Sequence, residues 1–173
     1  GLISMIDARL VPDAQEEITP GEAVAGMILN GLGFAHRPLA LTPQFFTNQP
    51  LDLLLRPGVR AEMCHRFKLG RPLDAVQAYG CDLLLREWAL AGCVQERMAQ
   101  RFHHLDTTSF CLTGAYIPDR DEPAICITHG YSKDHRPDLK QAVLELMVSQ
   151  DGGVPLVSKS WDGNTSDTQI FQE

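Results

Sequence analysis

The sequence lacks a long apolar run, a basic leader followed by apolar residues, and any surplus of basic residues. A membrane helix needs about 18 or more consecutive apolar residues, so we expect no membrane span. Without a leader there is no signal for secretion, and we expect a cytoplasmic protein. Because the chain begins with Gly1 rather than Met, we also expect its true N-terminus to lie upstream.

Closely spaced cysteines are also missing. The five cysteines include no CxxC pair, which argues against a structural zinc site and favours reduced thiols. Of the six histidines, His103 and His104 are adjacent and would point to opposite faces of a strand, and no HExxH spacing occurs. We therefore expect no histidine-based metal site.

The charge balance is acidic, with a net charge of −7. DNA affinity comes largely from neutralising phosphates, so this stretch alone resembles a poor DNA binder. Any basic surface must be local or lie outside the chain. The 173 residues, 44% of them hydrophobic, suffice for one sizeable domain or two small ones.

The composition changes near residue 100, from helical periodicity to alternation and β-branched residues. We therefore predict an α+β protein with a helical domain over residues 1–99 and a strand-rich domain over residues 100–173. Four helix starts are expected in the first part: the capping box Thr19-Pro20-Gly21-Glu22, Thr42-Pro43, Pro57, and Pro72, with the longest helix running from Pro72 to about Gly92.

The second part is predicted to form strands. Alternation favours a strand over residues 102–110 and a short one over 124–128. Residues 139–149 are apolar on both faces, which fits a strand covered on both sides, with helix as the alternative. The turn Asp151-Gly152-Gly153 favours a hairpin whose return strand is 154–161, with an edge position or bulge near Pro155.

Asp106 is the strongest candidate for chemistry. It lies in the middle of a predicted strand, where Asp is disfavoured, and a strand would hold its carboxylate rigidly enough for a hard cation such as Mg²⁺. The structural alternative is an Asp at a strand end or edge that bonds Thr107 or Thr108. The local pattern leaves both interpretations open.

Two loops add further candidates. Residues 162–167 are rich in turn formers and read first as a surface loop, although Asp167 is a candidate to cap a following helix or to approach a metal. The segment 129–138 combines basic, aromatic and hydroxyl groups. Lys133 and Arg136 suit phosphate, and Tyr131 suits base stacking, the alternative being a solvated connector.

Taken in order, these motifs resemble the first half of the catalytic domain of bacterial insertion-sequence DDE transposases, the group whose later motifs read DREAD and YREK. The helical region resembles the uncharacterised domain that precedes the catalytic domain in one branch of that group. Each motif is weak alone, and the ordered set carries the resemblance: His104-Leu105-Asp106-Thr107-Thr108, His129-Gly130-Tyr131-Ser132-Lys133, Arg136-Pro137-Asp138-Leu139, Gly153-Val154-Pro155-Leu156 and Gly163-Asn164-Thr165-Ser166-Asp167.

The resemblance implies the first strands of a ribonuclease-H-like fold, with Asp106 matching the first acid of the DDE triad. The DREAD and YREK regions, which carry the other two acids, have no counterpart in this sequence, so Asp106 alone is carried over as catalytic. The implied chemistry is two-metal phosphoryl transfer with Mg²⁺ or Mn²⁺ at transposon-end and target DNA, by a protein expected to be a homodimer when full length. This chain alone is expected to hold no metal and to be inactive.

Three other interpretations were weighed. A non-catalytic remnant would act only through DNA binding or dimerisation of its helical part. A helix-turn-helix regulator would leave the strand-rich half unexplained. A metal hydrolase of another fold would use His104 and Asp106, but the sequence places no further ligands for it.

Overall fold

The computed structural model describes residues 1–12, 15–32, 38–99, 101–117 and 125–172. The chain folds into two compact units, residues 1–84 and 85–173. The first is helical, and the second contains a three-stranded antiparallel sheet, so the predicted α+β class is confirmed. Within the described ranges, every helix is too short or too polar to cross a membrane.

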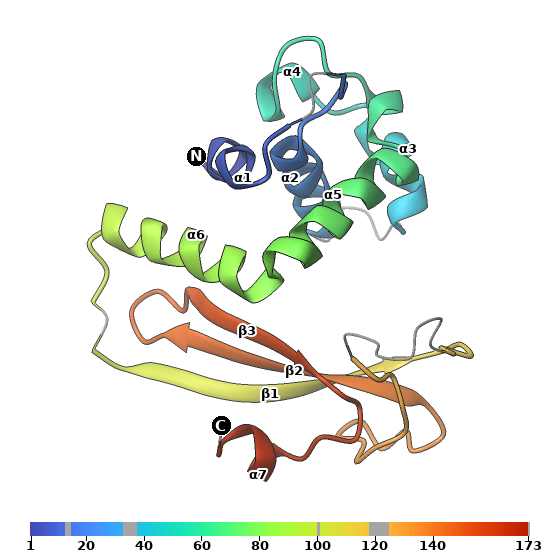
Figure 1. The fold of residues 1–173 in the computed structure, drawn as a ribbon, viewed down its shortest axis with the longest axis vertical. Helices are drawn as coiled ribbons and strands as arrows, with labels where there is room; N and C mark the ends of the chain where they lie inside the picture. The colour runs from blue at the N-terminus through green and yellow to red at the C-terminus, as the bar shows by residue number, and fades with distance from the viewer. Residues whose placement is uncertain (13–14, 33–37, 100, 118–124, 173) are drawn as a thin grey trace. The chain divides into compact units, whose positions relative to one another are not determined.

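The first unit consists of short helices around an apolar core. The helix α2 lies centrally among them, and α1 packs against it (Figure 1). Phe46 and Leu69 are fully buried in this core. The elements are α1 (Leu2–Arg9), α2 (Pro20–Gly31), η1 (Leu39–Leu41), α3 (Thr42–Phe46), α4 (Leu51–Leu54), η2 (Ala61–Cys64) and α5 (Arg66–Tyr79).

The start of α2 confirms the predicted capping box. Thr19 Oγ1 accepts a hydrogen bond from the Glu22 backbone N–H at 3.2 Å, and the Glu22 carboxylate accepts one from the Thr19 N–H at 2.8 Å. Pro20 occupies the first turn, where no N–H is needed. Only 3% of the Glu22 side chain is exposed, and Arg56 Nε lies 2.6 Å from its second oxygen. A single carboxylate thus joins the helix start to the α4–η2 connection.

Two predicted helix starts were wrong. Pro57 begins a turn, because Gly58 adopts φ +89 and its N–H bonds Asp52 Oδ1 at 3.1 Å. Pro72 lies inside α5 rather than at its first turn. An interior proline costs about 3 kcal/mol, and burial of Leu69 and Pro72 itself on this helix offsets that cost. The chain breaks instead at Gly80, whose φ of +109 suits glycine.

The helix α6 (Cys81–Gln95) follows that break and runs across the division between the two units. The predicted long apolar stripe is therefore shared by two helices, α5 and α6. In the second unit, Ala89 and Cys93 of α6 are buried with Leu156 in a small apolar core. Met98, Val154 and Val157 pack around it.

Three strands form the sheet of the second unit, in the order β1-β2-β3 and antiparallel throughout (Figure 1). They are β1 (His103–Leu112), β2 (Lys140–Ser149) and β3 (Pro155–Trp161), followed by α7 (Asp167–Ile170). The strand predicted over 139–149, its Asp-Gly-Gly turn and its return strand are confirmed. The ladder between β2 and β3 shifts register between Met147 and Val148, opposite Pro155, which confirms the irregularity expected there.

The short strand predicted over 124–128 was wrong for the residues that can be judged. Residue 124 is outside the described ranges, and Thr128 makes only an isolated bridge with Gln141. The Thr128 N–H donates to the Gln141 carbonyl at 3.3 Å, and the Gln141 N–H donates back at 2.8 Å. This pair places Thr128 beside Gln141 of β2 without making a further strand.

Candidate functional site

Asp106 lies in the middle of β1, opposite Leu146 of β2, as the sequence predicted. Its side chain is exposed. One carboxylate oxygen, Oδ1, accepts a hydrogen bond from the Thr107 backbone N–H at 2.8 Å. That contact fixes one oxygen of the carboxylate close to its own strand. It also matches the structural alternative, in which Asp106 bonds Thr107.

A second cluster lies on the other face of the same strand. Successive side chains of a strand alternate, so Thr107 projects opposite to Asp106. The Thr107 hydroxyl donates to Asp167 Oδ1 at 2.6 Å and accepts from Lys133 Nζ at 2.8 Å. Lys133 Nζ also donates to the Thr107 carbonyl at 2.9 Å and lies 3.2 Å from Asp167 Oδ2. We call these three residues, Thr107, Lys133 and Asp167, the Thr107 cluster.

The burial of the cluster is uneven. Thr107 is 5% exposed, whereas the Lys133 and Asp167 side chains are 38% and 48% exposed. The Thr107 hydrogen bond is the main cause that lowers the pKa of Asp167, and Lys133 lowers it further. A hollow of about 130 Å³ lies beside the cluster, between Ser109, Tyr131 and the 165–167 segment. Lys133 and Asp167 thus form a neutral ion pair that makes charge-assisted hydrogen bonds to a buried hydroxyl.

Two close backbone crossings bring Lys133 and Asp167 to Thr107. A Cβ atom on Gly130 would lie 2.0 Å from the Gly163 carbonyl oxygen, and one on Gly163 would lie 2.0 Å from the Gln141 carbonyl oxygen. The buried Gln141 amide donates to the Gly163 and Tyr131 carbonyls at 2.6 and 3.1 Å. Both loops are therefore stacked on the first residues of β2, a contact that only glycine permits.

Asp167 does not join Asp106 in this structure. It is the first residue of α7, and Ser166, not Asp167, caps that helix by accepting from the Gln169 N–H at 3.4 Å. Its carboxylate is bound to the Thr107 face of the sheet, whereas Asp106 is on the opposite face. The described part of the chain contains no group of three His, Cys, Asp or Glu residues that could hold a metal ion.

The three residues predicted to contact DNA are placed differently from one another. Tyr131 is 86% exposed. Arg136 binds Asp138 through two hydrogen bonds, at 2.9 and 2.7 Å, and these raise the pKa of Arg136 and lower that of Asp138. Lys133 is engaged by Thr107 and Asp167, so its ammonium is directed into the protein rather than presented to a phosphate.

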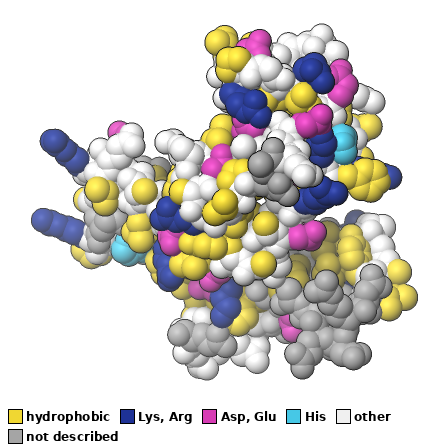
Figure 2. All heavy atoms as spheres, turned by 45° about the horizontal axis from the view of Figure 1, so that its top comes forward, with side chains coloured by type: hydrophobic (Ala, Val, Ile, Leu, Met, Phe, Trp, Pro, Cys, Tyr) yellow, Lys and Arg dark blue, Asp and Glu magenta, His cyan; other side chains and the backbone are white. Residues whose placement is uncertain are grey.

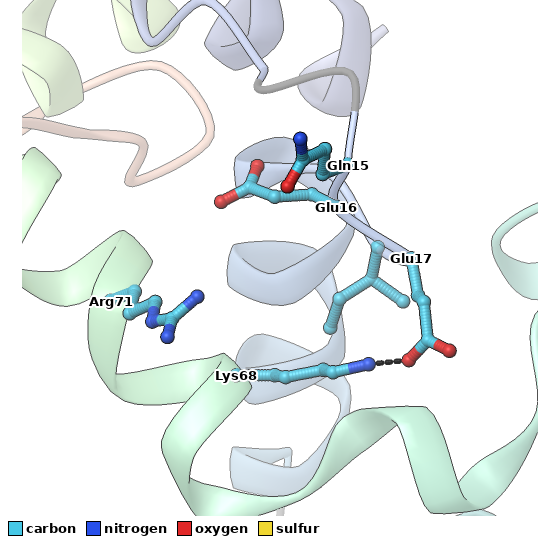
Figure 3. Close-up of a pocket in the computed structure, with 6 residues that line it drawn as sticks. Gln15, Glu16, Glu17, Lys68 and Arg71 are labelled. Atoms are coloured by element: carbon cyan, nitrogen blue, oxygen red, sulfur yellow. Dashed lines mark ion pairs between the residues drawn. The ribbon is translucent and has the colours of Figure 1, made fainter.

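The charged surface is mixed. On the face drawn in Figure 2, both Lys or Arg and Asp or Glu side chains are visible among hydrophobic and uncharged ones. In the first unit, a hollow of about 430 Å³ lies between residues 15–18 and α5. Lys68 and Arg71 project into it from α5, and Lys68 pairs with Glu17 (Figure 3). Cations and carboxylates are thus balanced there as well.

Sequence reasoning missed the Thr107 cluster and the buried Glu22–Arg56 pair. From the sequence, Thr107 is expected only as a partner of Asp106, although alternation places its side chain on the face opposite Asp106. The contact between Thr107 and Asp167 spans 60 residues, and that between Thr107 and Lys133 spans 26. Local pattern carries no signal for contacts at such separations.

One comparison with known proteins gives a family. The profile described as a domain of unknown function, DUF4277, matches residues 1–90, within the region for which an uncharacterised helical domain was expected. No curated protein and no solved structure matches the chain. Since 90 of its 173 residues fit that profile, the chain belongs to the DUF4277 family.

Proposed function

We propose that this chain is the first part of a DDE-type DNA transposase, in which a DUF4277 domain precedes the opening strands of a ribonuclease-H-like catalytic domain. The observation that carries the proposal is the exposed carboxylate of Asp106 in the middle of β1, the first strand of an antiparallel meander. The ordered motif set described above supports the same assignment. Asp106 is then the first acid of the catalytic triad.

The described residues do not by themselves fit a bound Mg²⁺ or Mn²⁺. Asp106 supplies one carboxylate, and the described ranges hold no group of three His, Cys, Asp or Glu residues that could bind a metal ion. Octahedral Mg²⁺ needs more than one such ligand or a bound phosphate. We therefore assign no catalytic step to this chain alone, and expect a gel assay to find no Mg²⁺-dependent cutting of transposon-end DNA by it.

The decisive experiment uses the complete gene, read to its own stop codon, together with its flanking inverted repeats. Excision and integration are counted in cells for the wild type, Asp106→Asn and Asp82→Asn. Loss of a metal ligand is expected to lower transposition by at least about 100-fold in Asp106→Asn. Asp82, an exposed acid of α6, is the matched control and should leave the frequency unchanged. Transposition at the wild-type frequency in Asp106→Asn would remove the proposal.

A second candidate is a non-catalytic protein that acts through DNA binding or dimerisation of its helical unit. The net charge of −7 favours it, because the chain alone has no basic surplus for neutralising the phosphates of transposon-end DNA. Binding of the 173-residue chain to duplex DNA at increasing salt distinguishes DNA binding from dimerisation as the role of such a protein. A steep loss of affinity with salt indicates phosphate contacts, whereas no binding at low salt leaves dimerisation.

A further inference from the structure

A second hollow of the sheet unit lies at the end of β3 and contains neither Asp106 nor the Thr107 cluster. Its volume is about 510 Å³. The residues that matter for its chemistry are one aromatic ring, one cation, one carboxylate and three uncharged hydrogen-bonding side chains: Trp161, Lys159, Asp162, Asn164, Thr165 and Gln169. Nothing in the proposed catalytic role uses these residues.

The Trp161 ring is fixed in place. Its indole N–H donates to Glu145 Oε2 at 2.8 Å, so the polar edge of the ring already has a partner. Lys159 Nζ lies 3.6 Å from the ring centroid, over one face. Because Lys159 is exposed, the face of the ring that it covers is the side that solvent reaches. What Trp161 can offer a ligand is therefore a flat π surface, with a cation beside it.

Unused hydrogen-bonding groups surround this surface. Gln169 Oε1 accepts from the Ser166 N–H and hydroxyl, each at 3.1 Å, which aligns the amide and leaves its nitrogen to donate elsewhere. The exposed Asn164 amide has no hydrogen bond to any described residue. A carboxamide presents a donor and an acceptor side by side, which matches the edge of a nucleobase.

The charges favour a neutral planar group within the hollow. Asp162, which lines the hollow, accepts from the Cys126 N–H through Oδ1 at 2.6 Å, and the Glu145 carboxylate accepts from the Trp161 indole beside it. A phosphate placed deep in the hollow would meet them. Once a base has displaced Lys159 from the Trp161 ring, this long side chain can reach a phosphate at the rim of the hollow.

We propose that the Trp161 hollow binds one unpaired nucleobase of a single DNA strand, stacked on Trp161 with Asn164 and Gln169 at its edge. The choice of a DNA strand over a free nucleotide rests on the proposed transposase function. The stacking chemistry itself does not depend on it. Duplex DNA should not fit, because its bases are already stacked and paired.

The test exploits the presence of only two tryptophans, Trp88 and Trp161. In Trp88→Phe, Trp161 is the only indole, and its fluorescence should be quenched saturably by a ten-nucleotide single strand. The same ten-nucleotide sequence as a duplex should quench the Trp161 fluorescence far less. A deoxynucleoside monophosphate should also quench it far less. By polarisation with a labelled single strand, Trp161→Ala should bind about 5- to 150-fold more weakly, the range for removing the ring under one stacked base. Trp88→Ala, the same change at the other indole, should bind like the wild type.

Asn164→Ala tests the site without changing the Trp161 ring. Because Asn164 is exposed, we expect its substitution to leave the fold intact. It should weaken binding of the single strand while circular dichroism stays unchanged. Equal affinity of wild type, Trp161→Ala and Asn164→Ala would overturn the proposal, and so would equal quenching by the mononucleotide, which indicates a free-nucleotide site. Asp106→Asn should quench normally. Failure of transposition and failure of quenching are therefore read separately.

Discussion

Replacing Thr107 with Val tests whether the Thr107 cluster holds the two loops on the sheet. Valine keeps the shape of threonine, so the change removes a hydroxyl without opening a cavity. Two hydrogen bonds are lost, the one to Asp167 Oδ1 at 2.6 Å and the one from Lys133 Nζ at 2.8 Å. Lys133 keeps its bond to the Thr107 carbonyl at 2.9 Å.

The expected loss follows from burial. A hydrogen bond to a charged group contributes about 1.5–3 kcal/mol. The Lys133 and Asp167 side chains are 38% and 48% exposed. In the variant, water therefore replaces part of the hydrogen bonding that the hydroxyl provides to them. We expect Thr107→Val to lower the free energy of unfolding by about 1–2 kcal/mol. In a chain of 173 residues, that corresponds to a fall in Tm of about 2–8 °C.

The same substitution should change the response to acid. The Thr107 hydrogen bond lowers the pKa of Asp167 in the folded protein below its ordinary value of 3.8. Stability from this shift is present above that value and is lost as the pH falls through the lower, folded pKa. The difference between wild type and Thr107→Val should therefore be largest near neutral pH and shrink below about pH 4.

The assay is urea unfolding followed by circular dichroism at several pH values. Thr108→Val is the matched control, because Thr108 is the next residue of β1 and is exposed on the other face. It should leave both the stability and its pH dependence unchanged. If Thr107→Val unfolds at the same urea concentration as Thr108→Val, the cluster does not anchor the loops and the reasoning fails.

Three further predictions concern single positions. Gly163→Ala should lower the free energy of unfolding in urea by at least about 1–3 kcal/mol, because its Cβ would lie 2.0 Å from a backbone oxygen of β2. Wild-type stability of this variant would contradict the close approach of the two backbones. Arg56→Gln should lower the free energy of unfolding by about 3 kcal/mol and Glu22→Gln by about 1–2 kcal/mol, because only Arg56→Gln leaves the buried Glu22 carboxylate without its cation. The reverse order in urea unfolding would refute the role of the pair. Burial, and secondarily Glu22, raises the pKa of Cys64 to about 11, so Cys64 should resist a thiol reagent at about pH 8 while the exposed Cys81 reacts, as mass spectrometry would report.

Local signals predicted the elements whose causes are local. The capping box at Thr19 requires only four consecutive residues, and the β2–β3 hairpin follows from Asp-Gly-Gly between two apolar runs. The strand around Asp106 was likewise predicted from alternation. The observed strand begins one residue later and ends two residues later than the predicted strand.

Errors occurred where burial outweighed a local preference. Pro72 suggests a helix start, yet it lies within α5, where Leu69 and Pro72 itself are buried. The Thr107 cluster depends on loops that return to β1 from far along the chain. Their positions are set by the close crossing at Gly163 and by the buried amide of Gln141, and neither leaves a periodic trace in the sequence.

The contacts of Thr107 also affect how β1 can pair. β1 is an outer strand, and the Phe102 carbonyl accepts from Gln150 on the side of β2, so alternation directs the main-chain groups of Thr107 to the open side. Both of these groups are occupied, the N–H by Asp106 and the carbonyl by Lys133. Unpaired edges are where chains aggregate. The side chains of Asp106 and Lys133 thus cover the centre of this edge. Another strand can pair along β1 only after both have released the main chain of Thr107.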